Sequence, residues 1–334
     1  MNSEGYGMQV FNHTIEGFKN HSNFSKVFVI GLGCECAQIL LYKDQDTRDQ
    51  VIYLNIQDEG GTNKIIQNVS NQIFELLPDI NNVKREAIPL SELTVALQCG
   101  GSDSYSGITA NPALGFASDL LVANGGSSIL AETPEIYGAE HLLIERAKNN
   151  DIIKKLNKQI EWWKNYTKIN SSSLDNNPSP GNKKGGLTTI LEKSLGAVAK
   201  SGTSEMQDVL DYAEPIKKKG FNFMDSPGYD PVSVTGQVAS GSNIICFTTG
   251  RGSCFGYKPV PSIKIATNTN MFSRLEEDMD INAGTIMDGE NTIEEIGQKI
   301  FNQIIDTASG GKTKSEINGY GDDEFNPWII GATL

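Results

Sequence analysis

Several features are scarce in this sequence of 334 residues, and each scarcity excludes a class of protein. The chain has no run of 18 apolar residues, so no membrane-spanning helix is expected. Its N-terminal segment lacks the basic and apolar stretches of a secretory signal, and we expect a cytoplasmic protein. Basic residues number 28 against 41 acidic ones, and the net charge of −13 argues against nucleic acid as a partner, because nucleic-acid binders present basic patches.

Cysteine and histidine are also few. Five cysteines without a signal peptide indicate reduced thiols rather than a disulfide framework, and they leave thiolates available to soft metals. None of the three histidines belongs to a ligand-spaced pair, and neither a zinc motif nor a Ser-His-Asp arrangement is visible. The acidic surface repels an acidic substrate, so such a substrate requires a local lysine, arginine or metal.

The sequence does contain strand-like apolar runs that alternate with helical periodicity. Continuous apolar strands separated by helices are typical of parallel sheets covered on both faces. We therefore predict an α/β protein with two α/β subdomains, whose mainly parallel sheets are flanked by helices. The polar segment 169–186 predicts a boundary, with one domain over 1–169 and a second over 170–334. The second domain ends in an amphipathic helix whose Thr292 and Glu295 have capping-box spacing.

The most informative segment begins with a strand at 93–99 and carries chemistry at the point where the strand gives way to a loop. Cys99 is followed by two glycines, which permit close backbone approach, and then by Ser102, Asp103 and Ser106. Asn111 and a proline open the next helix, whose N-terminus could hold a carboxylate. Ligands bind at the carboxyl ends of strands in open α/β sheets, so we predict a functional loop here.

Two further strand ends carry acidic or thiol groups. Glu132 ends a strand and is a candidate metal ligand or general base, whereas Glu135, after a proline turn, fits a solvated glutamate better. Cys34 and Glu35 follow a strand in the segment GLGCEC, where they are either a metal ligand and a base or a small buried thiol in a turn. That segment lacks the third glycine of a dinucleotide fingerprint, so NAD is rejected.

The cations and amides that an acidic substrate needs occur on glycine-rich loops. Asn182, Lys183 and Lys184 lie in SPGNKKGG, with a solvated charge pair as the alternative interpretation. Arg251 lies between glycines after a strand and is suited to bidentate carboxylate binding. Asn268 ends another strand and could reach the same cleft.

Seven motifs in order along the chain resemble one family. They are IGLGCE, LQCGGSDSYSGITANPALG, NPSPGNKKGG, EKSLG, FTTGRGS, IKIATN and MDINAGTI, and together they are similar to the galactarate dehydratase and altronate dehydratase family. The resemblance runs from about residue 5 to residue 308 and is stronger to the galactarate branch. The sulfolactate sulfo-lyase large subunit belongs to the same superfamily and is a second possibility.

The resemblance implies a ferrous-iron-dependent hydro-lyase. A hexonic or hexaric acid would lose a proton α to its carboxylate and then its β-hydroxyl, giving a 2-keto-3-deoxy acid. The metal would act as a Lewis acid, and a lysine or arginine would stabilise the enediolate. On the matching motifs we assign acid/base roles to Glu132, Lys183 and Asp103, and metal contact to Cys34, Cys99 and Glu35. The expected substrate-binding residues are Ser102, Asn111, Asn182, Lys184, Arg251 and Asn268.

Two departures from the family pattern bear on activity. Members usually begin with a small SAF-type domain, so we expect either a C-terminal portion or the large part of a split enzyme, which is weak or inactive alone. Tyr6 stands where the family usually has cysteine, and we hypothesise that positions 6, 34 and 99 converge on one iron site, mononuclear or an iron–sulfur cluster. Cys36 would compensate only if its loop reorganised.

Three functions follow from these observations. The first is a sugar-acid dehydratase that binds a small-molecule sugar acid and forms a homo-oligomer. The second is a non-catalytic sugar-acid-binding module, and the third is a C–S lyase that releases sulfite from sulfolactate.

Overall fold

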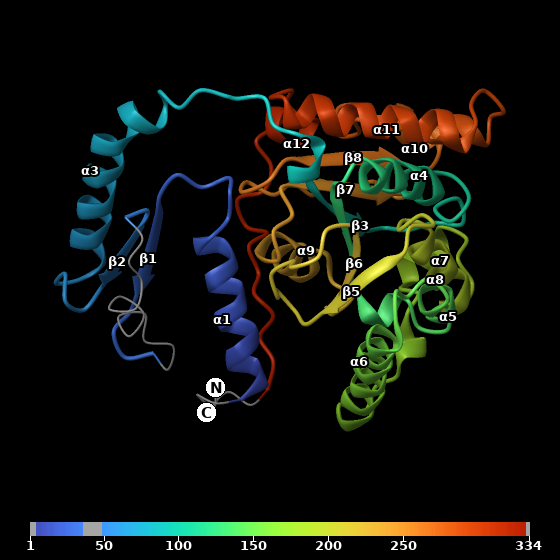
Figure 1. Ribbon diagram of the computed structural model, residues 1–334, viewed down its shortest axis with the longest axis horizontal. Coiled ribbons are helices and arrows are strands. Elements are labelled where there is room, and N and C mark those ends of the chain that lie inside the picture. The colour runs from blue at the N-terminus through green and yellow to red at the C-terminus, as the bar shows by residue number, and fades with distance from the viewer. Residues whose placement is uncertain (1–4, 36–48, 332–334) are drawn as a thin grey trace.

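A computed structural model describes residues 5–35 and 49–331 and contains two parallel sheets (Figure 1). The larger sheet has seven strands in the order β5-β6-β4-β3-β7-β8-β9, and every pair is parallel. Its strands are β3 (Thr94–Cys99), β4 (Ser127–Leu130), β5 (Met206–Leu210), β6 (Phe221–Met224), β7 (Ile244–Thr249), β8 (Ser262–Ala266) and β9 (Ile281–Asn282). The predicted α/β class with parallel sheets is confirmed.

Helices cover both faces of this sheet because successive side chains of a strand point to opposite faces. Val95 and Leu97 of β3 belong to the core beneath α4 (Ala110–Ala123) and α11 (Ile293–Ala308). Ala96, between them, packs on the other face with Val234 and Val238 of α9 (Asp230–Ala239). Strands buried on both faces explain the uninterrupted apolar runs of the sequence.

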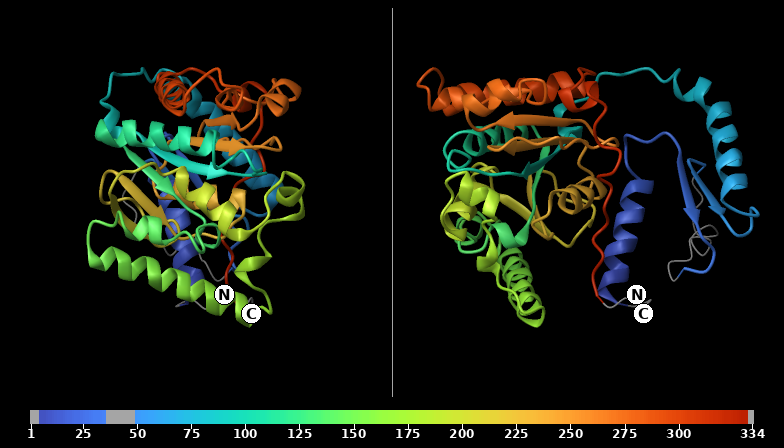
Figure 2. Two further views of the ribbon diagram at one scale, coloured as in Figure 1. Left: turned by 90° about the vertical axis from the view of Figure 1, so that its right-hand side faces the viewer. Right: turned by 180° about the vertical axis from the view of Figure 1, so that it is seen from behind.

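The remaining helices surround the sheet or lie near its edges (Figures 1 and 2). They are α5 (His141–Ile144), α6 (Asn150–Ile169), α7 (Pro180–Lys184), α8 (Ile190–Ala199), α10 (Thr269–Arg274) and α12 (Lys314–Ile317), with the 3₁₀ turns η1 (Leu90–Glu92), η2 (Thr133–Glu135), η3 (Leu174–Asn176) and η4 (Gly284–Ile286). The capping box of Thr292 and Glu295 starts α11 as predicted. Across the described ranges, no helix is both long and apolar enough to cross a membrane.

The N-terminal part forms a separate small sheet. Strands β1 (Val27–Gly31) and β2 (Val51–Asn55) pair in parallel, and α3 (Thr62–Ile80) follows them. Helix α1 (Tyr6–Lys19) packs against α9 of the large unit, and the small sheet lies on the far side of α1 (Figures 1 and 2).

The predicted boundary at 169/170 does not coincide with a division of the fold. Strands β3 and β4 precede this point, yet they occupy the centre of the sheet to which β5 to β9 belong. A cut there would separate strands that share backbone hydrogen bonds. The extended segment 81–89 instead connects α3 to the large unit (Figure 1). The correction is therefore one large α/β unit from residue 90 onward.

Strand order places a crevice at the centre of the large sheet. From β3 the chain adds β4, then β5 at the edge and β6 between β5 and β4, and then returns to place β7 on the opposite side of β3. Such a switch point opens a crevice at the carboxyl ends of the strands, where α/β proteins bind ligands. Here those ends are Cys99 of β3 and Thr249 of β7.

Candidate active site

A thiol and two carboxyl groups meet at the carboxyl ends of β3 and β4. Cys99, Glu132 and Glu135 are all buried, and one ligand atom from each lies within 4.8 Å of the others. Cys99 ends β3, Glu132 immediately precedes the single turn η2 that follows β4, and Glu135 is the last residue of that turn. The expectation that Glu135 is solvated is wrong, since only 5% of its surface is exposed.

Two lysines from α8 and its C-terminus complete this cluster. The Lys193 ammonium donates to Glu135 Oε1 at 2.6 Å, and it also reaches the side-chain oxygens of Asn177 at 2.9 Å and Asn182 at 3.4 Å. Lys200 is fully buried and lies 2.9 Å from Cys99 Sγ. Sequence reasoning missed both lysines. The sequence offered one indication of them, namely that a helix rich in small apolar residues carries lysines on the side that is buried.

Helix α8 reaches the Cys99 loop because two glycines touch. A Cβ on Gly196 would lie 3.1 Å from the Cα of Gly107, and a Cβ on Gly107 would meet Gly196 at the same distance. Asn111 Nδ2 donates to the Gly196 carbonyl at 2.8 Å, and its Oδ1 accepts from Thr248 at 2.6 Å. Asn111 therefore positions the helix that carries both lysines. Its side chain is 1% exposed and does not line the pocket.

Burial and neighbouring charge separate the pKa values of the two glutamates. Burial, reinforced by the charge of Glu135, holds the pKa of Glu132 well above its ordinary value. Burial also opposes ionisation of Glu135, but Lys193 and Lys200 outweigh it and lower the pKa of that carboxyl. Two adjacent carboxyl groups thus favour different protonation states, which is a common arrangement in acid/base sites.

Glu132 has two further unusual properties. Its backbone adopts φ 75°, a left-handed conformation that is uncommon for residues other than glycine. Both of its carboxyl oxygens are buried without a hydrogen-bond partner among the described residues. Buried polar atoms normally have partners, so this pair of oxygens marks a place where a ligand would satisfy them.

Burial raises the pKa of the Cys99 thiol to about 11, despite the attraction of Lys200. Burial also raises the pKa of Asp230 to about 6, with the charge of Glu135 adding to the effect. Asp230 begins α9 and accepts from Gln98 at 3.1 Å. The cluster therefore combines ammonium, carboxylate and neutral acid groups that are all buried from solvent.

This cluster opens into a pocket of about 580 Å³. Its other lining residues include Ser102, Asn177, Asn182, Tyr229, Asp230 and Arg251. The backbone N–H of Arg251 donates to the Gly101 carbonyl at 3.0 Å, which fixes the arginine beside the Cys99 loop. Its guanidinium has no hydrogen bond or ion pair with any described residue, so it is available to an anion.

The predicted residues fall into three groups. Ser102, Asn182 and Arg251 line the pocket together with Cys99, and Asn182 Nδ2 donates to the Ser102 carbonyl at 2.9 Å. The loop that was predicted as a domain boundary thus forms one wall of the site. Glu132 lies beside the lining residues Cys99 and Glu135.

A second group forms a hydrogen-bonded network next to the pocket. Asp103 accepts from Ser106 at 2.9 Å, from Thr267 at 2.9 Å and from Asn268 at 3.0 Å. Asn268 also caps α10 through Met271. These bonds join the β3 and β8 loops, and neither Asp103 nor Asn268 lines the pocket.

The third group lies apart from the site. Lys183 and Lys184 are exposed on α7 and do not line the pocket. Cys34 and Glu35 follow β1 of the small sheet, where Glu35 accepts from the Gly33 N–H at 2.5 Å and the Cys34 thiol is exposed. The structure does not bring Cys34 to Cys99, and Cys36 lies outside the described residues.

Tyr6 is also separate from Cys99 and packs among aromatic rings. Its ring centroid lies 6.0 Å from that of Trp162 and 6.3 Å from that of Trp328. The hypothesised convergence of positions 6, 34 and 99 on one iron site therefore has no support in this arrangement of the described residues.

The fold and site define a parallel α/β protein with an acid–thiol–lysine cluster at its topological switch point. Residues 90–333 match the family model described as D-galactarate/Altronate dehydratase, C-terminal. Residues 2–81 match D-galactarate dehydratase/Altronate hydrolase, second domain. The chain belongs to the D-galactarate/altronate dehydratase family. The two matches are separated by residues 82–89, which lie in the segment that connects the two sheets.

Individual relatives agree with this assignment. The chain is 44% identical to galactarate dehydratase (L-threo-forming) of Escherichia coli over 90% of its length and 59% of the relative's. It is 39% identical to altronate dehydratase of Bacillus subtilis, over 94% of this chain and 63% of that protein. It is 32% identical to (2R)-sulfolactate sulfo-lyase subunit beta of Chromohalobacter salexigens, over 79% of this chain and 68% of the relative. The chain thus spans about three fifths of the two dehydratases.

Proposed function

We propose that this chain carries the catalytic pocket of a sugar-acid dehydratase acting on a six-carbon aldaric or aldonic acid such as galactarate or altronate. The names of its dehydratase relatives support the reaction class. The observation that carries the proposal is the buried cluster of Cys99, Glu132 and Glu135 with two lysines, placed where the sheet opens into a pocket.

Residues of the pocket can divide the reaction between them. Arg251 would bind the carboxylate next to the reacting carbon, because its guanidinium is free and suited to bidentate contact. Glu135, kept ionised by its lysine neighbours, would take the α-proton. The Lys193 ammonium, 2.6 Å from Glu135, would donate a proton to the departing β-hydroxyl, which leaves as water. The resulting enol becomes the 2-keto-3-deoxy acid.

Ferrous iron is the cofactor that the family resemblance implies, and the donor set here fits one ion. Cys99 and Glu132 would hold it beside Glu135, which is kept as the base, and the two unpartnered oxygens of Glu132 are the observation that favours a cation there. When bound, the ion would act as a Lewis acid on the substrate. The three thiolates of a cluster are not assembled among the described residues, so we favour a mononuclear ion. We also propose that the protein is cytoplasmic, that it forms a homo-oligomer, and that a separate N-terminal SAF-type domain or subunit is its partner.

An anaerobic assay tests the reaction. The purified chain is given ferrous iron and a panel of galactarate, altronate and sulfolactate, alone and with the part of the relatives that it does not span. We expect 2-keto-3-deoxy acid from one sugar acid. Absence of turnover in both settings would favour a binding module, and sulfite released from sulfolactate would indicate the C–S lyase.

Matched variants test the residues. Lys193→Met should lower kcat at least about 100-fold, because it removes the proposed acid and a charge of the pocket. Lys183→Ala, which changes an exposed lysine of the loop, should leave kcat unchanged. Glu132→Gln should reduce the amount of iron bound per protein chain, which elemental mass spectrometry measures without reference to activity. Equal loss in both lysine variants would contradict the assignment.

A further inference from the structure

A second pocket lies beside the catalytic one. It has a volume of about 400 Å³, within the range of roughly 300–1,000 Å³ typical of small-molecule sites. Tyr6 and Gln9 of α1, Gln159 and Trp162 of α6, and Asp225 after β6 contribute to its lining. None of these residues lines the catalytic pocket.

Polar groups without protein partners gather in this pocket. Asp225 is 3% exposed, and its Oδ1 accepts from Trp163 at 2.7 Å and from Thr133, whereas its Oδ2 has no hydrogen bond to a described residue. The carbonyl oxygen of Gln159, a residue 8% exposed, also has none. The buried Gln159 oxygen calls for a hydrogen-bond donor from a ligand, and Asp225 Oδ2 offers a second acceptor without a protein partner.

Donor groups and aromatic rings complete the lining. The Tyr6 hydroxyl and the Lys158 ammonium make no hydrogen bond or ion pair with the described residues, and both residues line the pocket. The rings of Tyr6 and Trp162 stand 6.0 Å apart at 58°.

The charges of the pocket limit what it can bind. Lys155 is paired with Asp208 at 2.8 Å, and Glu214 is paired with Lys217 at 3.1 Å. Among the described residues that line the pocket, Lys158 is then the one cation without an ion pair, and Asp211 and Asp225 are acidic members of the same lining. One carboxylate can be neutralised by Lys158, and a second would meet acidic groups.

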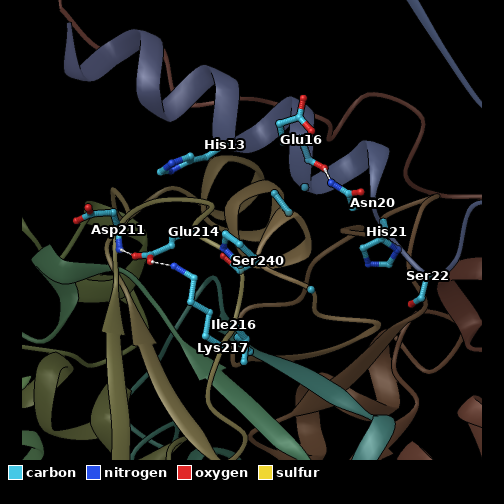
Figure 3. Close-up of a pocket in the computed structure, with 14 residues that line it drawn as sticks. His13, Glu16, Asn20, His21, Ser22, Asp211, Glu214, Ile216, Lys217 and Ser240 are labelled. Carbon is cyan, nitrogen blue, oxygen red and sulfur yellow. Dashed lines mark hydrogen bonds and ion pairs between the residues drawn. The ribbon is translucent and has the colours of Figure 1, made fainter. Parts of the chain in front are cut away.

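A larger neighbouring cavity of about 650 Å³ lacks these features (Figure 3). It adjoins the second pocket, since Asp211 and Glu214 line both. Several of its polar groups bond to the protein: His21 Nε2 lies 2.9 Å from the Ser242 carbonyl, and Glu214 accepts from the Lys217 ammonium and the Asp211 N–H. Figure 3 shows the Glu214 contacts as dashed lines.

We infer that the pocket of Tyr6, Lys158, Gln159, Trp162 and Asp225 binds a monosaccharide-sized polyhydroxy compound with at most one carboxylate. Hydroxyl groups both donate and accept, so they match the free acceptors of Asp225 and Gln159 as well as the Tyr6 hydroxyl. The C–H face of such a compound packs on aromatic rings, and a single carboxylate pairs with Lys158. The inference concerns binding and does not depend on the proposed dehydration.

Tryptophan fluorescence can test this inference. All three tryptophans of the chain, Trp162, Trp163 and Trp328, belong to the aromatic group around the pocket. Trp163 also lines the catalytic pocket, so the pocket variants assign each fluorescence change to its site. The protein is titrated with galactitol, galactonate and galactarate, which share a carbon skeleton and carry zero, one and two carboxylates. We expect saturable changes with the first two and at least tenfold weaker binding of galactarate at this site.

Variants locate the binding. Lys158→Ala changes an exposed side chain and should weaken galactonate binding about tenfold while sparing galactitol. Tyr6→Ala should weaken both, and Lys154→Ala, on the same helix but outside the pocket, should change neither. The inference is overturned if neither galactitol nor galactonate gives a saturable change. It is equally overturned if the changes persist in both pocket variants, because the ligand then binds elsewhere.

Discussion

The Lys193–Glu135 pair should contribute strongly to stability as long as both partners are present. The two groups are 2.6 Å apart with 9% and 7% of their side chains exposed. At an effective dielectric constant of about 20 their attraction is roughly 6 kcal/mol, most of which offsets the desolvation of both charges. Removing one partner leaves the other buried and uncompensated, which typically costs about 3–5 kcal/mol.

We therefore expect Lys193→Met to lower the free energy of unfolding by about 3 kcal/mol, the lower end, because Lys200 and Asn177 still favour the Glu135 carboxylate. Glu135→Gln should cost a similar amount, and the double variant should recover about 2–3 kcal/mol of the summed loss. The double variant should nevertheless be inactive, since the proposed acid and base are both gone.

Urea unfolding followed by circular dichroism measures this cycle. The exposed pair Lys154–Asp151, 3.1 Å apart, is the control and should show no measurable coupling. The deficit of Lys193→Met should also shrink as the pH falls through 4.5 and below. The lowered pKa of Glu135 stabilises the native protein only while that carboxyl is ionised. A coupling energy below about 0.5 kcal/mol would refute the reasoning.

Two other predictions concern the surroundings of the site. Gly196→Ala should lower the free energy of unfolding in urea by about 1–3 kcal/mol and lower kcat, because its Cβ would lie 3.1 Å from Gly107 Cα. The control is Gly181→Ala, whose Cβ would have its nearest neighbour atom 3.7 Å away and which should leave stability unchanged. Equal losses in the two variants would contradict the role of the glycine contact. Burial raises the pKa of Asp225 from 3.8 to about 6, so this residue makes the free energy of unfolding fall as the pH rises between those values. Asp225→Asn should remove that fall, gaining up to about 3 kcal/mol on the wild type by pH 7, and parallel pH curves for the two proteins would contradict it.

The sheet and the outline of the site follow from local sequence patterns. Apolar runs identify parallel strands, and the carboxyl ends of parallel strands share one edge, so Cys99, Glu132 and Arg251 were expected together. The structure places Cys99 and Arg251 on one pocket, with Glu132 beside it.

The rest depends on contacts that no local pattern encodes. Lys200 meets Cys99 across 101 residues, and helical periodicity cannot tell which side of α8 faces a thiol. Cys34 resembles Cys99 in following a strand, but the pattern does not tell which sheet that strand joins. The polar segment 169–186 looked like a linker because a loop that lines a polar pocket has the same composition as one that joins domains.

The mutual contact of Gly107 and Gly196 has a consequence for engineering the substrate range. It leaves no space of even one methyl group between the Cys99 loop and α8, so a side chain added at either glycine would displace the helix that carries Lys193 and leads to Lys200. Tyr229 is a different case, because it lines the pocket and is 56% exposed. Attempts to admit longer or bulkier acids should therefore vary position 229 and leave Arg251 and the two glycines unchanged.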